Sequence, residues 1–280
     1  MAIAELREAV TFLIKIPSLW IPGIVGGFLA AALWVIFNLS GTFFASRLLV
    51  ISALVLHLLT TGILVIIRDK NGDVKTLLSG GTRYYFRVLL PLLVIVFGIM
   101  LLFTVLMITF SFIGDVNDTS MITALAFGFM IPTVLVTFFY DTAAVFEERK
   151  VFASIHRSTQ LVMTHIKEVA AFLFVCASLA VGIVFMLMIV WEIALYDKLE
   201  PISLYNETQL QAFTPDQLIA MMGPGGMWIT AVVLFIGVFL LVPLLYSYKA
   251  CFYRKLVNNT FITQEPTTGE FDSKGRWFKY

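Results

Sequence analysis

"NGDVKTLLSGGTRYYFRVLLP", residues 71–91, separates two long apolar runs and is itself too polar to cross a bilayer. If residues 73–88 form a helix, the apolar side chains fall on one face and the basic side chains mostly on the other. The apolar face consists of Val74, Leu77, Leu78, Tyr85 and Val88. This pattern predicts a helix that lies on the membrane surface, with its basic face toward anionic headgroups.

Two features of the same stretch shape this prediction. We expect the Gly80-Gly81 pair to bend or interrupt the surface helix, because glycine costs helical stability. We expect Pro91 to fall in the first turns of the following span, where a missing backbone donor is tolerated.

The composition of the whole chain identifies its solvent as lipid. Hydrophobic residues make up 60% of the 280 residues and charged residues only 13%, and the mean hydropathy is +0.94. A soluble domain cannot bury that much apolar surface. A transmembrane helix needs about 20 mostly apolar residues. Six stretches qualify, at about 17–38, 46–67, 87–113, 120–140, 168–193 and 226–249.

The first of these stretches can also be read as a cleavable signal peptide, because small residues occur at 30–32. However, Glu5 and Glu8 interrupt the basic segment that such a signal needs, and the apolar run continues to Phe37. The sequence therefore favours a retained helix.

The distribution of charge predicts the orientation of the chain. Six spans place both termini on one side of the membrane, and all but two of the 19 Lys and Arg residues fall on that side. The two exceptions are Arg47 and Lys198. The positive-inside rule then predicts a multi-pass protein of the plasma membrane with both termini in the cytoplasm.

Two further amphipathic segments precede spans, at residues 1–17 and 150–172. The sequence thus predicts an all-α polytopic membrane protein with six transmembrane helices and three cytoplasmic interfacial amphipathic helices. Each amphipathic helix would be followed by a transmembrane hairpin, which gives three units of similar design. The alternative is that any loop joining two spans tends to be amphipathic. One membrane domain would cover residues 1–255, and 256–280 would form a polar cytoplasmic tail.

The segment "TFFYDTAAVFEERKVFASIHRSTQLVMTHIKEV", residues 137–169, resembles a signature in membrane domains attached to some glycerophosphodiester phosphodiesterases. It is also similar to their stand-alone, uncharacterised prokaryotic relatives. In that pattern a span ends near an acidic residue, here Glu147 or Glu148, before a small-apolar-basic-serine stretch, here 153–158. "LIKIPSLWIP", residues 13–22, is similar to the segment ahead of the first span. The resemblance implies a six-helix membrane bundle. It does not imply phosphodiesterase chemistry, because that activity belongs to a separate barrel of about 250 residues.

Candidate site residues are few. His57 is the ionisable side chain predicted deep inside a span, so it is a candidate intramembrane polar site. The alternative is a neutral imidazole bonded to a carbonyl or hydroxyl of a neighbouring helix. Pro132 and Pro243 are candidate kinks, either in broken helices around a binding site or in an ordinary packed bundle. The candidate contacts to anionic lipid are Lys75, Arg83, Arg87, Lys150, Arg157 and Lys167.

The sequence offers no motif for chemistry. It contains no nucleophile elbow, P-loop or dinucleotide glycine pattern, so no catalytic residue and no cofactor are predicted. His57, His156 and His165 are too dispersed to predict a metal site. Nucleic-acid binding has no support beyond basic edges that topology already explains.

Two functional interpretations follow. In the first, the protein is not an enzyme and organises membrane lipid or a partner protein at the cytoplasmic face, with a homo-oligomer as another possible assembly. In the second, it is a permease or a carrier of lipids or small molecules, with a path between the helical repeats. Sparse polar groups inside the spans favour the first interpretation, because a carrier for a charged solute needs more of them.

Overall fold

The apolar stretches form long helices, because a backbone in lipid must satisfy its hydrogen bonds within the segment. The computed structural model describes residues 2–111, 119–207, 209, 212–263, 269–271 and 277–279. The elements are α1 (Ala2–Lys15), η1 (Pro17–Trp20), α2 (Ile21–Ser40), α3 (Thr42–Asp69), α4 (Val74–Ser111), α5 (Thr119–Val136), α6 (Tyr140–Phe146), α7 (Val151–Thr164), α8 (Ile166–Ala194), α9 (Tyr196–Leu199), η2 (Glu200–Leu204) and α11 (Pro215–Thr263). Two short strands, β1 (Gly269–Phe271) and β2 (Trp277–Lys279), pair antiparallel near the C-terminus.

Six segments of the described chain are long and apolar enough to cross a membrane, which confirms the predicted fold class of an α-helical, multi-pass membrane protein. They are Pro17–Ser40, Thr42–Asp69, Val74–Thr109, Phe127–Phe146, Ile166–Ala194 and Gln217–Asn258. Residues 112–118, where the third predicted span ends, lie outside the described residues.

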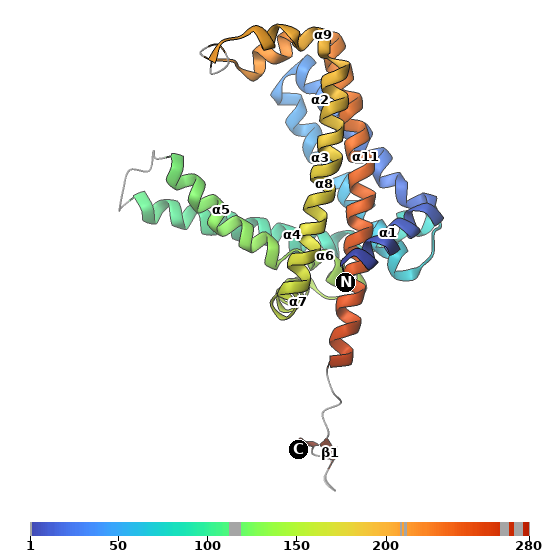
Figure 1. Cartoon of the computed structure of the whole chain (residues 1–280). Coiled ribbons are helices and arrows are strands. Elements are labelled where there is room, and N and C mark those ends of the chain that lie inside the picture. Colours follow the sequence, from blue (N-terminus) through green and yellow to red (C-terminus); the bar gives the residue numbers. More distant parts are fainter. Residues whose placement is uncertain are drawn as a thin grey trace.

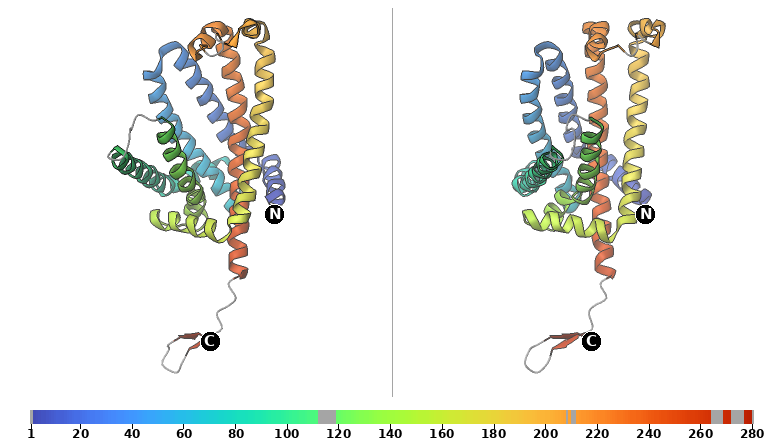
Figure 2. Two further views of the ribbon diagram at one scale, coloured as in Figure 1. Left: turned by 60° about the vertical axis from the view of Figure 1, so that its left-hand side comes forward. Right: turned by 90° about the vertical axis from the view of Figure 1, so that its left-hand side faces the viewer.

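The helices form a bundle with a projecting arm (Figures 1 and 2). Helices α2, α3, α8 and α11 run side by side, whereas the α4–α5 hairpin leaves them sideways. At one end of the bundle, α1, α6, α7 and the beginning of α4 surround the last turns of α3 and the second half of α11. We call this the basic end. Helix α9 lies at the opposite end.

The amphipathic stretch at residues 73–88 does not form a helix of its own. That it lies on a membrane surface remains a prediction. Helix α4 begins at Val74 and continues through the span without interruption. The Gly80-Gly81 pair does not interrupt it. These glycines instead allow α3 to approach closely. A Cβ added to Gly81 would lie 2.6 Å from the carbonyl oxygen of Leu58. Close approach through small residues is a common way for helices to pack in membranes.

The position of Pro91 is also corrected. It lies well inside α4 rather than in the first turns of a span. The face of α4 that packs on the core carries Leu77, Tyr84 and Val88, which are all nearly inaccessible. Leu78 from the predicted apolar face is instead half exposed. The amphipathic segment and the span therefore form a single helix, which packs against α3.

The other two amphipathic segments form separate helices, α1 and α7. Helix α1 buries Ala9 and Leu13, while Ile3 and Ile14 remain exposed. That these two helices lie on a membrane surface remains a prediction.

The two proline positions do not break their helices. Helix α5 continues past Pro132 to Val136, and α11 keeps helical dihedral angles at Pro243. The one residue with non-helical dihedral angles in α11 is Gly223. Pro243 instead packs at the crossing with α2, where its Cδ would lie 2.9 Å from a Cβ added to Gly23.

Candidate functional site

The fourth span is a broken helix, and a buried serine bridges the break. Helix α5 ends at Val136 and α6 begins at Tyr140, so backbone groups between them lose their helical partners. Ser158 of α7 supplies two of those partners. Its hydroxyl accepts a hydrogen bond from the Phe139 N–H at 2.9 Å and donates to the Val136 carbonyl at 2.9 Å. Ser158 is completely inaccessible, so the break is part of the packed interior.

Directly after this break, a buried ion pair links α6 to α11. The Lys249 ammonium lies 2.7 Å from Oδ1 and 2.8 Å from Oδ2 of Asp141. Asp141 is 3% exposed and Lys249 is 8% exposed. The ammonium also lies 4.3 Å from the ring centroid of Phe138. Charges in a low-dielectric environment are costly unless they are paired, and this geometry pairs them fully.

His57 is not an isolated ionisable group, which corrects the sequence analysis. It lies within electrostatic range of both Asp141 and Lys249. Its ring meets Tyr85 of α4 at a centroid distance of 6.0 Å. Its Nε2 atom is buried and has no hydrogen-bond partner among the described residues. The predicted alternative, in which a neighbouring helix satisfies the imidazole, is therefore not found at this nitrogen.

At the basic end, two consecutive carboxylates bind different helices. Glu147 accepts hydrogen bonds from Arg157 of α7 at 2.9 Å and from the Tyr253 hydroxyl of α11 at 2.7 Å. Glu148 accepts a hydrogen bond from Tyr84 of α4 and lies 3.5 Å from Arg68 of α3. Glu148 has a φ of 50°, a left-handed conformation that non-glycine residues seldom adopt. This turn of the backbone directs the two side chains to opposite sides.

The surroundings of both carboxylates favour the charged form. Burial by itself raises the pKa of Glu147, but the hydrogen bonds from Tyr253 and Arg157 outweigh it, so the pKa lies below the ordinary value. The hydrogen bond from Tyr84, assisted by Arg68, lowers the pKa of Glu148. Both groups are therefore acceptors for the cations around them at neutral pH.

Further ion pairs hold the N-terminal helix on α11. Lys255 bonds to Glu5, and a guanidinium nitrogen of Arg254 lies 2.5 Å from Glu8. Glu5 is buried, whereas Glu8 is half exposed. The two acids that argued against a signal peptide thus attach α1 to the end of the bundle.

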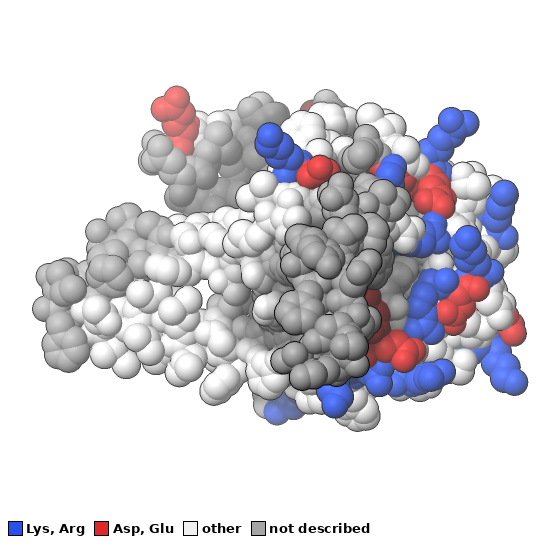
Figure 3. All heavy atoms as spheres, turned by 90° about the horizontal axis from the view of Figure 1, so that it is seen from below, with Lys and Arg blue, Asp and Glu red and all other residues white. Residues whose placement is uncertain are grey.

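The six predicted lipid contacts differ in how far they are paired within the protein. Arg157 is occupied internally, because it binds Glu147 and its side chain is only 12% exposed. Arg87 lies 3.9 Å from a carboxylate oxygen of Glu148 and keeps a side chain that is 41% exposed. The other four are exposed and form no ion pair with any residue that the structure describes, namely Lys75, Arg83, Lys150 and Lys167. Figure 3 looks onto the basic end, where Lys and Arg side chains gather, whereas the projecting arm is almost free of charge.

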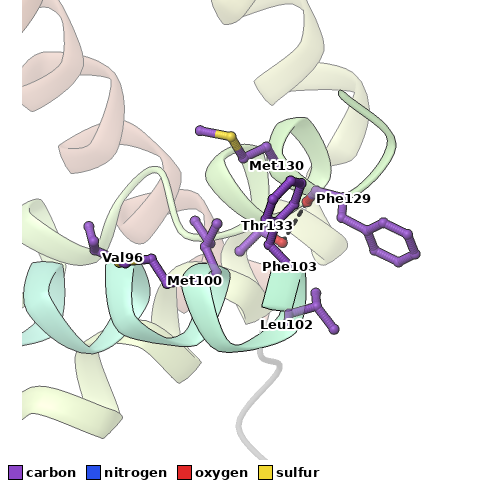
Figure 4. Close-up of a pocket in the computed structure, with 8 residues that line it drawn as sticks. Val96, Met100, Leu102, Phe103, Phe129, Met130 and Thr133 are labelled. Atoms are coloured by element: carbon purple, nitrogen blue, oxygen red, sulfur yellow. Dashed lines mark hydrogen bonds between the residues drawn. The ribbon is translucent and has the colours of Figure 1, made fainter. Parts of the chain in front are cut away.

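Two of the described hollows are apolar. A cavity of about 350 Å³ lies between α4 and α5 and is lined mainly by hydrophobic side chains (Figure 4). Its polar member is Thr133, whose hydroxyl donates to the Phe129 carbonyl at 2.8 Å. A groove of about 560 Å³ lies between α2 and α11. No charged residue lines either hollow, so both suit hydrocarbon rather than an ionic solute.

Among the described residues, no three His, Cys, Asp or Glu side chains gather as a metal site requires. The functional residues that the sequence analysis missed are Asp141, Lys249 and Ser158. The two charged residues lie at the predicted span ends, where charge is ordinary, and their pairing across 108 positions has no local signature. One feature of the sequence could have indicated the pair: Asp141 and Lys249 carry opposite charges and are predicted at the same depth in the membrane. Comparisons with known protein families, curated proteins and solved structures found no match to this chain.

Proposed function

We propose that this integral membrane protein is not an enzyme and that it organises lipid or a partner protein at the cytoplasmic face of the plasma membrane. In this proposal the basic end faces the cytoplasm, and both termini lie on that side. The resemblance to membrane domains attached to phosphodiesterases is compatible with such a role, since those domains carry no catalytic part.

The observation that carries the proposal is the set of exposed cations at the basic end. Four lysines and arginines extend there without a carboxylate partner in the described chain, while the neighbouring Arg68 and Arg157 are neutralised internally. Ion pairs and hydrogen bonds fix α1, α4 and α7 to the bundle, so the free charges are presented by a rigid frame. Each such cation near an anionic leaflet contributes about 1 kcal/mol of attraction.

The test is native mass spectrometry of the full chain extracted in lipid nanodiscs from its own membrane. We expect either an enriched anionic lipid or a stoichiometric second protein. A four-site variant, Lys75→Gln, Arg83→Gln, Lys150→Gln and Lys167→Gln, should lose most of that association. Arg47→Gln, at the opposite end, is the control and should keep it. A wild-type protein with bulk lipid composition and no protein partner would refute the proposal.

A carrier of lipids or small molecules is the second candidate, and the Asp141–Lys249 pair favours it. Charged residues inside spans and broken helices often mark translocation sites. Here the pair directly follows the break between α5 and α6 and lies near His57. In a reconstituted transport assay, Asp141→Leu/Lys249→Met and His57→Leu should both abolish transport without unfolding the protein. Retained transport in both variants would remove this candidate.

A further inference from the structure

The exposed face of α4 changes from basic to apolar near Phe86. From Phe86 onward it carries apolar side chains spaced by three or four residues, which are exposed in the bundle. They are Phe86, Leu90, Leu93 and Phe97, and Phe86 is 67% exposed. The preceding turn of the same helix carries Arg83, and Arg87 adjoins Phe86. Exposed phenylalanine and leucine side chains require hydrocarbon, so the two arginines lie where acyl chains meet headgroups.

The two arginines are neighbours in space as well. They are four residues apart on a helix, which places their side chains side by side. Their guanidinium carbons lie 5.4 Å and 5.5 Å from the ring centroid of Tyr84. Tyr84 is almost fully buried and its hydroxyl is bound to Glu148. The ring therefore forms a fixed support against which both guanidiniums rest.

The charge at this corner is not balanced. Arg68, which also lies over Tyr84, is bonded to Asp69 at 2.7 Å. Glu148 is the carboxylate closest to Arg87, but at 3.9 Å it is too distant for a direct hydrogen bond. The one hydrogen bond that Arg87 makes to it goes to the backbone carbonyl, at 3.3 Å. Among the residues that the structure describes, most guanidinium donors of the two arginines therefore have no acceptor.

We infer that Arg83 and Arg87 form a clamp for the phosphate of an anionic phospholipid. The inference rests on the proposed function and specifies its lipid. Guanidinium forks match the oxygens of a phosphate and can each donate two hydrogen bonds. Phe86 and Leu90, directly below the clamp, contact the acyl chains of the same lipid. This apolar neighbour distinguishes a lipid headgroup from free phosphate as the ligand.

The experiment is a titration of the full chain in mild detergent with phosphatidylglycerol, followed by native mass spectrometry. Phosphatidylcholine and inorganic phosphate serve as separate probes. We expect the double variant Arg83→Gln/Arg87→Gln to bind phosphatidylglycerol about tenfold more weakly than the wild type. The matched control is Lys150→Gln/Lys167→Gln, which removes the same charge from exposed positions at the same end and should weaken binding by less than about threefold.

Two additional variants separate a clamp from diffuse attraction and from misfolding. Arg83→Lys/Arg87→Lys keeps the charge and loses the forks, so most of the loss should persist. Arg83→Gln alone leaves the contact of Arg87 with Glu148 intact and should still weaken binding. Equal losses of binding in Arg83→Gln/Arg87→Gln and Lys150→Gln/Lys167→Gln would overturn the clamp while the proposed function stands. Full binding by Arg83→Lys/Arg87→Lys would do the same. Wild-type protein that does not prefer phosphatidylglycerol to phosphatidylcholine would refute the lipid form of that function as well. Equal competition by inorganic phosphate would show a free-phosphate site instead.

Discussion

Asp141 and Lys249 form a nearly inaccessible ion pair, with the ammonium 2.7 Å and 2.8 Å from the two carboxylate oxygens. The pair joins the short helix after the break in the fourth span to the second half of α11. Since the chain positions are 108 residues apart, this contact fixes the tertiary arrangement rather than a local structure.

Breaking this pair should destabilise the protein strongly. Asp141→Asn leaves the buried ammonium without a counter-charge, and Lys249→Met leaves the carboxylate uncompensated. We expect each to lower the free energy of unfolding by about 3–5 kcal/mol. Thermal unfolding of the full chain in nanodiscs measures the loss.

The double variant Asp141→Leu/Lys249→Met is the control for this prediction. Replacing both charges with apolar side chains is often nearly neutral, so its loss should be much smaller than the sum of the single losses. Additive losses would show that the two residues act independently.

The Ser158 hydroxyl should contribute more to stability than a single hydrogen bond does, because it satisfies two backbone groups. Ser158→Ala leaves the Phe139 N–H and the Val136 carbonyl unsatisfied in the interior, and each orphaned group costs about 1–3 kcal/mol. Ser154→Ala is a matched control on the same helix, because Ser154 is equally buried but, among the described residues, its hydroxyl bonds only to the Val151 carbonyl of its own helix. We expect a lower unfolding temperature for Ser158→Ala than for Ser154→Ala. Equal temperatures would contradict the bridging role.

The sequence was sufficient to predict the spans and insufficient to predict the site, for physical reasons. Partition into lipid depends on local length and hydropathy, and six spanning segments are therefore recovered. The stretch at 73–88 was not recognised as the beginning of a longer helix, because amphipathicity does not reveal what covers a face. Gly80 and Gly81 were read as helix breakers, yet they are packing surfaces for α3. Asp141 and Lys249 were placed at the ends of predicted spans. Their pairing could not be predicted, because only the fold brings them together.

Acid should weaken the contacts that Glu147 makes with Arg157 of α7 and Tyr253 of α11. The folded pKa of Glu147 lies below its ordinary value of 4.5, so its carboxylate stabilises the folded state above that pH. This contribution is lost as the pH falls below the ordinary value and through the folded pKa. Glu147→Gln should cost about 2 kcal/mol at neutral pH and make the unfolding temperature less sensitive to acid.

Unfolding temperatures measured between about pH 6 and pH 3 test this prediction. Arg157→Gln removes a principal partner of Glu147 and should reduce the acid sensitivity in the same direction. If wild type and Glu147→Gln lose stability in parallel across the whole range, Glu147 does not make this contribution.

The crossing of α3 and α4 should tolerate no side chain at its glycines. A Cβ on Gly81 would lie 2.6 Å from the carbonyl oxygen of Leu58, which is backbone and cannot move aside cheaply. Gly81→Ala should therefore lower the free energy of unfolding by about 1–3 kcal/mol. Gly98→Ala, on the same helix, is the control because, apart from its chain neighbours and the nearby backbone of its own helix, no atom of the described residues lies within 4 Å of its added Cβ. Alanine favours the helix over glycine, so Gly98→Ala should leave the unfolding temperature unchanged or raise it. A similar response of both variants would mean that helical propensity, and not the close approach of α3, determines the role of these glycines.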